Sequence, residues 1–338
     1  MKDKKIFIIA EAGVNHNGDI KKALKLVDIA KNSGADAIKF QLYRIEEKIS
    51  NIAFIHKYQK KNVGNQTMKS MARKYDLDWE KHKIIKSYCV KKKIKYMSSI
   101  TDTKSCDFLI NNLKTKIFKI SSGEITNLRF LKYCAKKNVP IILSTGMSNE
   151  KEIFNAVKII KKNSRARLYL LHCISLYPTQ VNLLNLRYID ILRRKFKCEV
   201  GFSDHTTGYM ASCIAVARGA KIIEKHFTLD KKLPGPDHSM SLSPIELNKF
   251  VKKIRETEQI LGKNIKTISK DEKEMIKVAR RGVISIKDIK KGNKFTNKNI
   301  SIMRPCIGIG ADQIHKVFGK KSKKNIKINT PIVYKMIK

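Results

Sequence analysis

Eight short apolar segments alternate with segments of helical period over residues 1–262 of this chain. The apolar segments are continuous, whereas a strand with one face in water would alternate apolar and polar residues; continuous runs are typical of strands buried on both faces of a parallel sheet. Eight strands that are each followed by a helix predict a closed α/β architecture, the (β/α)8 TIM barrel, with a doubly wound open sheet as the alternative. The predicted strands are Ile6–Ala10, Ala37–Phe40, Ile94–Ser99, Ile117–Ile120, Ile141–Ser144, Leu168–His172, Glu199–Ser203 and Lys221–His226.

The segments between the strands carry apolar residues at helical spacing. Clear examples are Ile20–Ser33, Glu150–Lys162 and Pro244–Leu261, the last with Ser243 as its N-cap. One connection is much longer than the others, since Arg44–Asp78 separates the second strand from its helix. Connections of that length are uncommon unless they are functional, so we expect a lid or substrate loop there.

The pattern changes after residue 262. A Lys-rich segment, residues 263–280, is predicted to be a linker, and residues 281–338 are predicted to form a small β-rich domain because short β-like segments alternate there with turns. The β-like segments are Gly282–Ile286, Ile300–Met303 and Pro331–Met336.

The chain is strongly basic, with 72 Lys and Arg against 29 Asp and Glu and a formal charge of +43. The lysines are spread along the whole chain and no nucleic-acid-binding motif accompanies them, so codon bias is the simpler explanation and we expect no nucleic-acid partner. A positive field would still steer an anionic substrate into a cleft.

Cysteines and apolar runs bear on the compartment. The chain has seven cysteines, an odd number, and none of them form a CxxC pair. We therefore expect buried or free thiols, which fit a reducing cytosol. The first apolar run is too short for a signal peptide, and no run reaches the roughly 18 apolar residues of a membrane span. We therefore expect a cytoplasmic protein with no membrane partner.

Polar residues gather where the predicted strands end. In a TIM barrel the carboxyl ends of all eight strands meet at one mouth, where active sites lie. The sequence therefore predicts one shared site at the mouth. The polar residues at or just after the strand ends are Glu11, Lys39, Ser99, Lys119, Ser122, Glu124, His172, Tyr177, Ser203, His205, Glu224 and His226.

Lys39 and Lys119 lie on or just after apolar strand runs, and lysine is rarely buried without a partner. They could form ion pairs with Glu11 or Glu124. They could also clamp a phosphate and a carboxylate, with nearby serines and glycines supplying further donors. A role as a Schiff-base nucleophile is a third interpretation.

His205 and His226 end adjacent predicted strands. Two neutral imidazoles with open positions beside them suit a divalent transition metal, although histidines satisfied by backbone groups would give the same pattern. His16 and His172 also lie near the predicted mouth and stay candidate ligands. Asp237 follows a Pro-Gly-Pro turn that either presents its carboxylate to the mouth or is simply a turn.

The ordered set of motifs resembles the sialic acid synthase (N-acetylneuraminate synthase) family, which includes legionaminic and pseudaminic acid synthases. The resemblance covers nearly the whole chain, and the C-terminal part resembles the antifreeze-like (SAF, β-clip) domain of the same family, with Arg304-Pro305 at the matching place. The barrel motifs are Ile8–Gly18, Lys39–Gln41, Lys119–Glu124, Ile142–Met147, Leu171–Cys173, Tyr177–Pro178, Gly201–Thr206, Glu224–Thr228 and Gly235–Asp237.

The resemblance implies a transferase that condenses phosphoenolpyruvate with N-acetylmannosamine or a related acetamido sugar aldehyde and water, giving a sialic-type nonulosonic acid and phosphate. A legionaminic or pseudaminic acid synthase acting on a diacetamido-trideoxy hexose is the alternative within the family. A Schiff-base aldolase and a non-catalytic carbohydrate or nucleic-acid binder are the alternatives from other classes. The implied cofactor is a divalent metal, Mn2+ first, with Mg2+ or Co2+ as alternatives.

The resemblance also assigns roles by position. It implies metal ligation by the two strand-end histidines, and Glu11 or Glu124 as the general base. It implies a domain-swapped homodimer, because Arg304 matches an arginine that reaches a neighbouring subunit's site. Departures at Leu42, Ser175 and Cys306-Ile307 concern the sugar rather than the reaction. The implied sets are His205 and His226 for the metal; Lys39, Lys119, Ser99, Ser122 and Ser203 around phosphoenolpyruvate; and Glu11, Glu124, Tyr177 and Asp237 facing the sugar or the metal.

Overall fold

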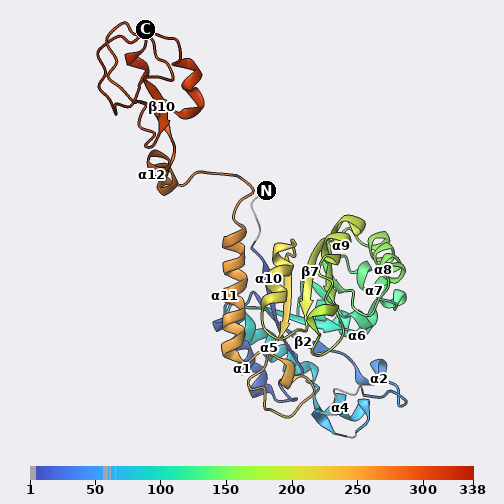
Figure 1. Ribbon diagram of the computed structural model, residues 1–338. Coiled ribbons are helices and arrows are strands. Elements are labelled where there is room, and N and C mark those ends of the chain that lie inside the picture. Colours follow the sequence, from blue (N-terminus) through green and yellow to red (C-terminus); the bar gives the residue numbers. More distant parts are fainter. Residues whose placement is uncertain (1–4, 56–59, 61, 65) are drawn as a thin grey trace. The chain divides into compact units, whose positions relative to one another are not determined.

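Eight parallel strands form a closed barrel in the computed structural model, which describes residues 5–55, 60, 62–64 and 66–338 (Figure 1). The last strand closes onto the first, with Cα partners from Phe7↔Ile222 to Glu11↔His226. The predicted TIM barrel is therefore confirmed, and the open sheet is wrong. The strands are β1 Phe7–Gly13, β2 Ala37–Leu42, β3 Lys95–Ile100, β4 Phe118–Ile120, β5 Ile141–Ser144, β6 Leu168–Cys173, β7 Glu199–Asp204 and β8 Ile222–His226.

Helices surround the strands, and their ends follow local capping chemistry. The helix after β8 begins after Ser243, whose hydroxyl accepts from Glu246 N while the Glu246 carboxylate accepts from Ser243 N, a reciprocal capping box. The predicted helices Ile20–Ser33 and Pro244–Leu261 are found to within one residue. The barrel helices are α1 Ile20–Asn32, α2 Ile45–Lys48, α4 Met68–Lys74, α5 Trp79–Lys91, α6 Thr103–Asn111, α7 Leu128–Lys136, α8 Glu150–Asn163, α9 Tyr188–Phe196, α10 Met210–Ala217 and α11 Pro244–Leu261.

Inside the barrel, an apolar cluster and a polar layer lie two residues apart along the strands. Because side chains that share one face of a strand are spaced by two residues, each apolar residue of the cluster is followed on the same face by a polar residue nearer the mouth. The barrel interior thus has an apolar layer beneath its polar mouth. The apolar cluster contains Ile9, Ala37, Met97, Ile142, Leu171 and Ile222, and the residues two positions later are Glu11, Lys39, Ser99, Ser144, Cys173 and Glu224.

The long connection Arg44–Asp78 contains α2 and α4, and its residues 56–59, 61 and 65 lie outside the described residues. Its described part has a small apolar cluster of its own around Tyr43, Ile49 and Ala72. Asn62 Nδ2 donates to Pro236 O at 2.8 Å, which ties this connection to the turn that carries Asp237. Whether it moves as a lid stays a prediction.

Residues 263–338 form the second compact unit, separate from the barrel unit at residues 1–262. Antiparallel strands β9 Gly282–Ser285 and β10 Ile300–Met303 cover an apolar core that includes Phe295. Helix α12, Lys270–Ala279, lies in the segment predicted to be a linker, and Cys306 N donates to Lys277 O at 3.0 Å, which joins α12 to this unit.

The third β-like segment of this unit, Pro331–Met336, is not a strand. Pro331 makes one isolated bridge to Ile284, and Tyr334–Met336 is a short 3-10 turn. The bridge does not extend because Val283 N donates to Ile309 O and Thr330 N donates to Ser285 Oγ, so neither flanking residue completes a reciprocal pair. Among the described residues, no helix is long and apolar enough to cross a membrane.

His82 on α5 is a titratable group buried in the layer between the helices and the barrel. Its Nδ1 is 2.8 Å from Tyr96 Oη, and its ring packs edge-on against Phe40. Burial lowers the pKa of His82 to about 4. The folded chain therefore holds this imidazole neutral at a pH where the unfolded chain protonates it.

We predict that the free energy of unfolding falls as the pH falls from 6.5 towards 4, with His82 contributing about 1.4 kcal/mol per pH unit. The sign follows because the unfolded state binds the extra proton in that window. His82→Asn keeps a hydrogen-bonding nitrogen near Tyr96 but cannot titrate. It should therefore reduce the slope of the unfolding free energy against pH by the equivalent of about one proton.

Urea unfolding followed by the fluorescence of Trp79, the single tryptophan, measures this slope. His315→Asn, at an exposed histidine, is the control; an unchanged slope in His82→Asn contradicts the prediction.

Candidate active site

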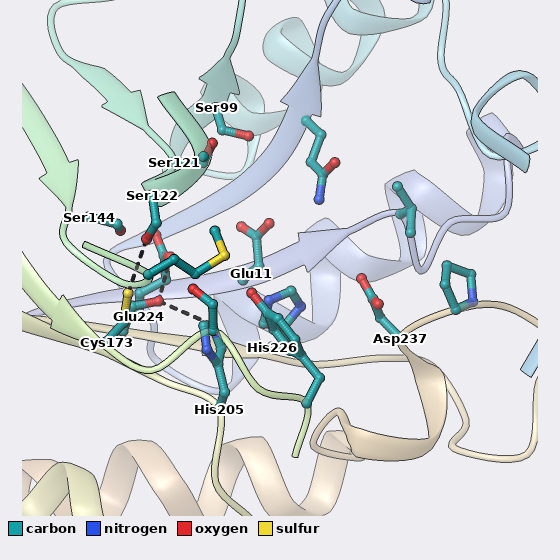
Figure 2. Close-up of a pocket in the computed structure, with 18 of the residues that line it drawn as sticks. Glu11, Ser99, Ser121, Ser122, Ser144, Cys173, His205, Glu224, His226 and Asp237 are labelled. Atoms are coloured by element: carbon teal, nitrogen blue, oxygen red, sulfur yellow. Dashed lines mark hydrogen bonds between the residues drawn. The ribbon is translucent and has the colours of Figure 1, made fainter. Parts of the chain in front are cut away.

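A cavity of about 700 Å³ opens at the carboxyl ends of the barrel strands. Figure 2 shows the side chains of Glu11, Glu224, His205 and His226 converging on it. The predicted shared site at the barrel mouth is therefore present as a single cavity. Of the predicted residues, those that line it are Glu11, Lys39, Ser99, Lys119, Ser122, Tyr177, Ser203, His205, His226 and Asp237.

Four buried charged groups form the centre of the cavity. Lys39 Nζ is 2.9 Å from Glu11 Oε2 and 3.6 Å from Glu224 Oε2. Lys119 Nζ is 3.6 Å from Glu224 Oε1 and donates to Ser144 Oγ at 2.8 Å. Glu224 therefore lies between the two ammonium groups. We call Glu11, Lys39, Lys119 and Glu224 the ionic cluster.

The two carboxyls of the ionic cluster titrate in opposite directions. Burial raises the pKa of Glu11 to about 8, and the neighbouring Glu224 charge adds to the effect despite the opposing Lys39. Burial alone would raise the pKa of Glu224 as well, but the charges of Lys119 and Lys39 outweigh it and hold that pKa well below its usual range. One carboxyl is thus suited to exchange protons near neutral pH while the other stays ionised.

The two ammonium groups also differ. Burial lowers the pKa of Lys119 despite the attraction of Glu224. Burial acts in the same direction on Lys39, but the charges of Glu11 and Glu224 outweigh it and raise the pKa of Lys39. Lys39 is therefore the more firmly charged of the two.

Hydroxyl groups surround the ionic cluster. Ser203 Oγ donates to Glu224 Oε1 at 2.9 Å, and Ser122 Oγ accepts from Gly146 N at 3.0 Å and lies 3.3 Å from Cys173 Sγ. A Cβ at Gly146 would lie 2.8 Å from Cys173 Sγ, so the close approach of this loop requires glycine. Small hydroxyl and backbone N–H groups are thereby held close to the ionic cluster.

The two histidines face each other at the side of the cavity. Their ring centroids are 5.7 Å apart, a spacing compatible with two imidazoles that share one ion. His205 Nδ1 lies 2.7 Å from Ile174 O, and because a carbonyl only accepts, the neutral ring carries its proton on Nδ1 and leaves Nε2 as a lone pair. His226 Nδ1 is buried and has no hydrogen-bond partner in the part of the chain that the structure describes.

Both imidazoles are held in the neutral form that binds metals. Burial lowers the pKa of His205 to about 4 and that of His226 further. The carbonyl that orients His205 is the kind of contact that metal-binding histidines make through their second nitrogen. Among the described residues no group of three or more His, Cys, Asp or Glu could hold an ion. The arrangement therefore fits a metal held by two imidazoles, with the remaining positions left to other ligands.

The rest of the cavity, towards α4, has a mixed lining in which apolar residues are joined by Gln41, Lys48 and Tyr75. Asp237 points into it, and burial raises the pKa of Asp237 to about 6 (Figure 2). The Tyr177 ring lies 4.2 Å from that of His205, at the boundary between the two parts of the cavity. The apolar lining comes from α4 and its surroundings and consists of Tyr43, Ile49, Met68, Met71 and Ala72, joined by Leu176 and Leu183.

One predicted residue of the barrel unit is not part of the cavity lining. Glu124 lies in the short helix after β4, where its carboxylate accepts from Asn127 Nδ2 at 3.1 Å. Of the two carboxylates predicted as partners of the lysines, Glu11 pairs with Lys39, whereas among the described residues Lys39 and Lys119 make no ion pair with Glu124 and contact Glu224 instead. Arg304 belongs to the second unit, where it is exposed just after β10. Its predicted role at a neighbouring subunit's site stays a prediction.

The other two candidate histidines have structural contacts instead. His172 Nε2 is 2.7 Å from Leu184 O, and its ring stacks on Phe202. His16 Nδ1 accepts from Gly18 N at 3.0 Å. Neither lines the cavity, whereas His205 and His226 do.

Sequence reasoning placed Glu224 at a strand end but assigned it no role. The available signal was its spacing: it lies two residues before His226 and therefore faces the same side of β8. What the spacing could not show is that both lysines reach it. Cys173, which shares a hydrogen bond with Ser122, was missed for the same reason.

Comparison with known proteins places the chain in a defined group. The model of the NeuB family matches residues 26–266, and that of the SAF domain matches residues 280–338. Two relatives are N,N'-diacetyllegionaminic acid synthases. The one from Campylobacter jejuni is 46% identical and covers 96% of this chain and 98% of its own; the one from Legionella pneumophila is 39% identical and covers 98% and 94%.

A solved structure agrees with these matches. The crystal structure of an N-acetylneuraminic acid (sialic acid) synthetase from Leptospira borgpetersenii, in complex with citrate, superposes with a TM-score of 0.72 at 34% identity. It covers 81% of this chain and 90% of its own. The SAF-domain match also confirms the predicted character of the small C-terminal domain.

We predict that the purified protein binds one Mn2+ per chain and that His226→Ala weakens this binding more than about 100-fold, because one of two imidazole ligands is lost. Titration followed by the electron paramagnetic resonance of free Mn2+ measures the affinity. His172→Gln is the matched control, since His172 bonds a carbonyl outside the cavity. Equal Mn2+ affinity in His226→Ala and the unmodified protein would reject the two-histidine site.

Proposed function

This chain belongs to the NeuB family, and on that premise we propose that it joins phosphoenolpyruvate to an open-chain acetamido sugar and water, releasing phosphate and forming a nonulosonic acid. The observation that carries the proposal is the ionic cluster beside the two imidazoles. Two ammonium groups and a rim of serines suit a small, multiply charged anion, and the adjoining part of the cavity suits a sugar.

The ionic cluster carries a net positive charge in the empty site, and this charge attracts an anion. With Glu11 protonated and Glu224 ionised, the two lysines leave one net positive charge. The buried, water-excluded setting strengthens that charge towards a phosphate or carboxylate. Serine hydroxyls at positions 99, 122 and 203 add neutral donors that orient the anion.

The reaction requires a bond between C3 of phosphoenolpyruvate and C1 of the aldehyde, then addition of water at C2 and loss of phosphate. A divalent metal on His205 and His226 would act as a Lewis acid towards an oxygen of the sugar. The chain's own part is to hold the two substrates together and to move protons. Glu11 suits proton transfer, since it faces the cavity with a pKa near neutrality, whereas Glu124 does not line the cavity.

A Schiff-base aldolase is the second candidate, because burial lowers the pKa of Lys119 and so favours a neutral amine nucleophile. Against it, the ammonium group of Lys119 is engaged by Ser144 and Glu224. Borohydride reduction in the presence of pyruvate separates the two: a covalent adduct at Lys119 supports the aldolase, and its absence supports the synthase.

The sugar is best described as a diacetamido-trideoxy hexose of the legionaminic type. Two observations support this choice over N-acetylmannosamine. The relatives from Campylobacter jejuni and Legionella pneumophila bear that activity in their names. The apolar side chains of α4, Met68 and Met71, offer contacts for a 6-methyl group and a second acetyl methyl, where a hydroxymethyl group would lose hydration.

The remaining expectations stay predictions. They are Mn2+ as the physiological metal, a homodimer in which Arg304 completes a neighbouring subunit's site, and a cytoplasmic location.

We predict phosphate release when phosphoenolpyruvate is combined with Mn2+ and 2,4-diacetamido-2,4,6-trideoxymannose, slower release with N-acetylmannosamine, and none with EDTA. Lys119→Met should lower kcat/KM for phosphoenolpyruvate at least about 100-fold, because a buried charge-assisted contact is lost. Lys158→Met on α8 removes the same charge from an exposed position and is the control. Full activity with EDTA present would argue against the metal, and activity retained in Lys119→Met would argue against the clamp.

We predict that the KM for the sugar rises as the pH falls through 6, about tenfold for one pH unit below the pKa of Asp237, because the protonated carboxyl loses its capacity to accept two hydrogen bonds from sugar hydroxyls. Initial rates between pH 5 and 7.5 measure this, with the KM for phosphoenolpyruvate measured in parallel. Asp237→Asn should have a high sugar KM that varies little with pH. A variant that keeps the pH profile of the unmodified protein would remove Asp237 from the sugar contact.

A further inference from the structure

A second buried ion pair lies directly behind the two histidines, on the outer face of the barrel. Lys225 Nζ is 3.1 Å from Asp204 Oδ2, and both side chains are almost fully buried. The two residues are Cα partners on β7 and β8. Each precedes a histidine in the sequence, so the pair joins the strand ends that carry His205 and His226.

The carboxylate of Asp204 also shapes the turn that carries His205. Its Oδ1 accepts from Thr206 N at 2.8 Å and from Thr206 Oγ1 at 2.7 Å, while its Oδ2 accepts from Ser212 Oγ of α10 at 2.6 Å. Lys225 Nζ donates to Thr206 O as well. The backbone on both sides of His205 is thereby held by the same two side chains.

Stability does not explain this pair well. Two charges taken out of water cost several kcal/mol each, and apolar side chains of similar volume often stabilise a core as much or more. What a fully hydrogen-bonded pair does provide is one defined geometry, since any displacement leaves a buried charge without a partner. The groups beside the pair that need one geometry are the two imidazoles.

We propose that Asp204 and Lys225 are positioning residues that fix the separation and orientation of His205 and His226 by tying the residue 204–206 turn to the end of β8. The inference rests on the proposed metal role of the two histidines for its function, but its geometric part stands apart from that role. Residues that orient metal-binding histidines typically contribute tenfold to a hundredfold to metal affinity.

The test is the double substitution Asp204→Asn with Lys225→Met, which removes both charges and roughly preserves volume. Asn keeps an acceptor for Thr206 N, so the turn survives while its tie to β8 is lost. The melting temperature should stay within about 5 °C of the unmodified protein. The Mn2+ dissociation constant should rise at least about tenfold. In a crystal structure of the variant, the imidazole rings should depart from their 5.7 Å separation or relative tilt.

Asp36→Asn with Arg255→Met is the matched control. That ion pair, 2.7 Å between Arg255 Nη2 and Asp36 Oδ2, joins the residue before β2 to helix α11, at the opposite end of the barrel. It should leave Mn2+ affinity and the imidazole geometry unchanged whatever it does to the melting temperature.

The outcomes separate the two hypotheses. Mn2+ affinity within threefold of the unmodified protein, with the imidazoles unmoved, overturns the positioning role, and a large loss of melting temperature in addition would make the pair structural only. If the unmodified protein shows no Mn2+ binding that depends on His226, the proposed metal role fails. The crystallographic readout then still decides whether the pair sets the imidazole geometry.

Discussion

Four charged side chains meet inside this barrel where water is largely excluded, and the rest of the site is arranged around their mutual compensation. Glu224 contacts both lysines, and Lys39 also contacts Glu11. Removing Glu224 would leave Lys119 without an ion-pair partner in the cluster, and an unpaired buried charge costs several kcal/mol. The cluster persists because the opposite charges are close and because serine hydroxyls occupy the remaining hydrogen-bonding positions.

The same balance of charges also prepares the site to exchange protons and to bind an anion. Burial raises the pKa of Glu11 towards neutrality, and the two lysines keep Glu224 ionised, so the empty cluster can accept an anion with little rearrangement of charge. In the proposed function, the ionic cluster binds an anion, the neutral imidazoles beside it bind a metal, and the rest of the cavity binds a sugar. The proposed synthase chemistry uses all three parts, and a simple binding protein would need no proton-exchanging carboxyl.

Much of this was predictable because strand periodicity is local. Continuous apolar runs located all eight strands, and polar residues at their ends located the mouth. Glu124 shows where that reasoning stops: it lies only two residues after Ser122, yet the short helix that contains both turns its carboxylate to Asn127. Helix α12 is a second case, since a Lys-rich segment reads as a linker until its contact with Cys306 places it in the second unit.

The amino-acid sequence by itself determined the barrel, its polar mouth and the family, because these follow from two-residue and 3.6-residue periods and from motifs that are contiguous in the chain. Only the tertiary structure decided which residues become partners: that Glu224 rather than Glu124 joins the lysines, that His205 and His226 rather than His16 or His172 face each other, and that Asp204 and Lys225 pair behind them. The physical reason is that ion pairing and shared metal ligation depend on distances across neighbouring strands, which are set by barrel closure and not by separation along the chain.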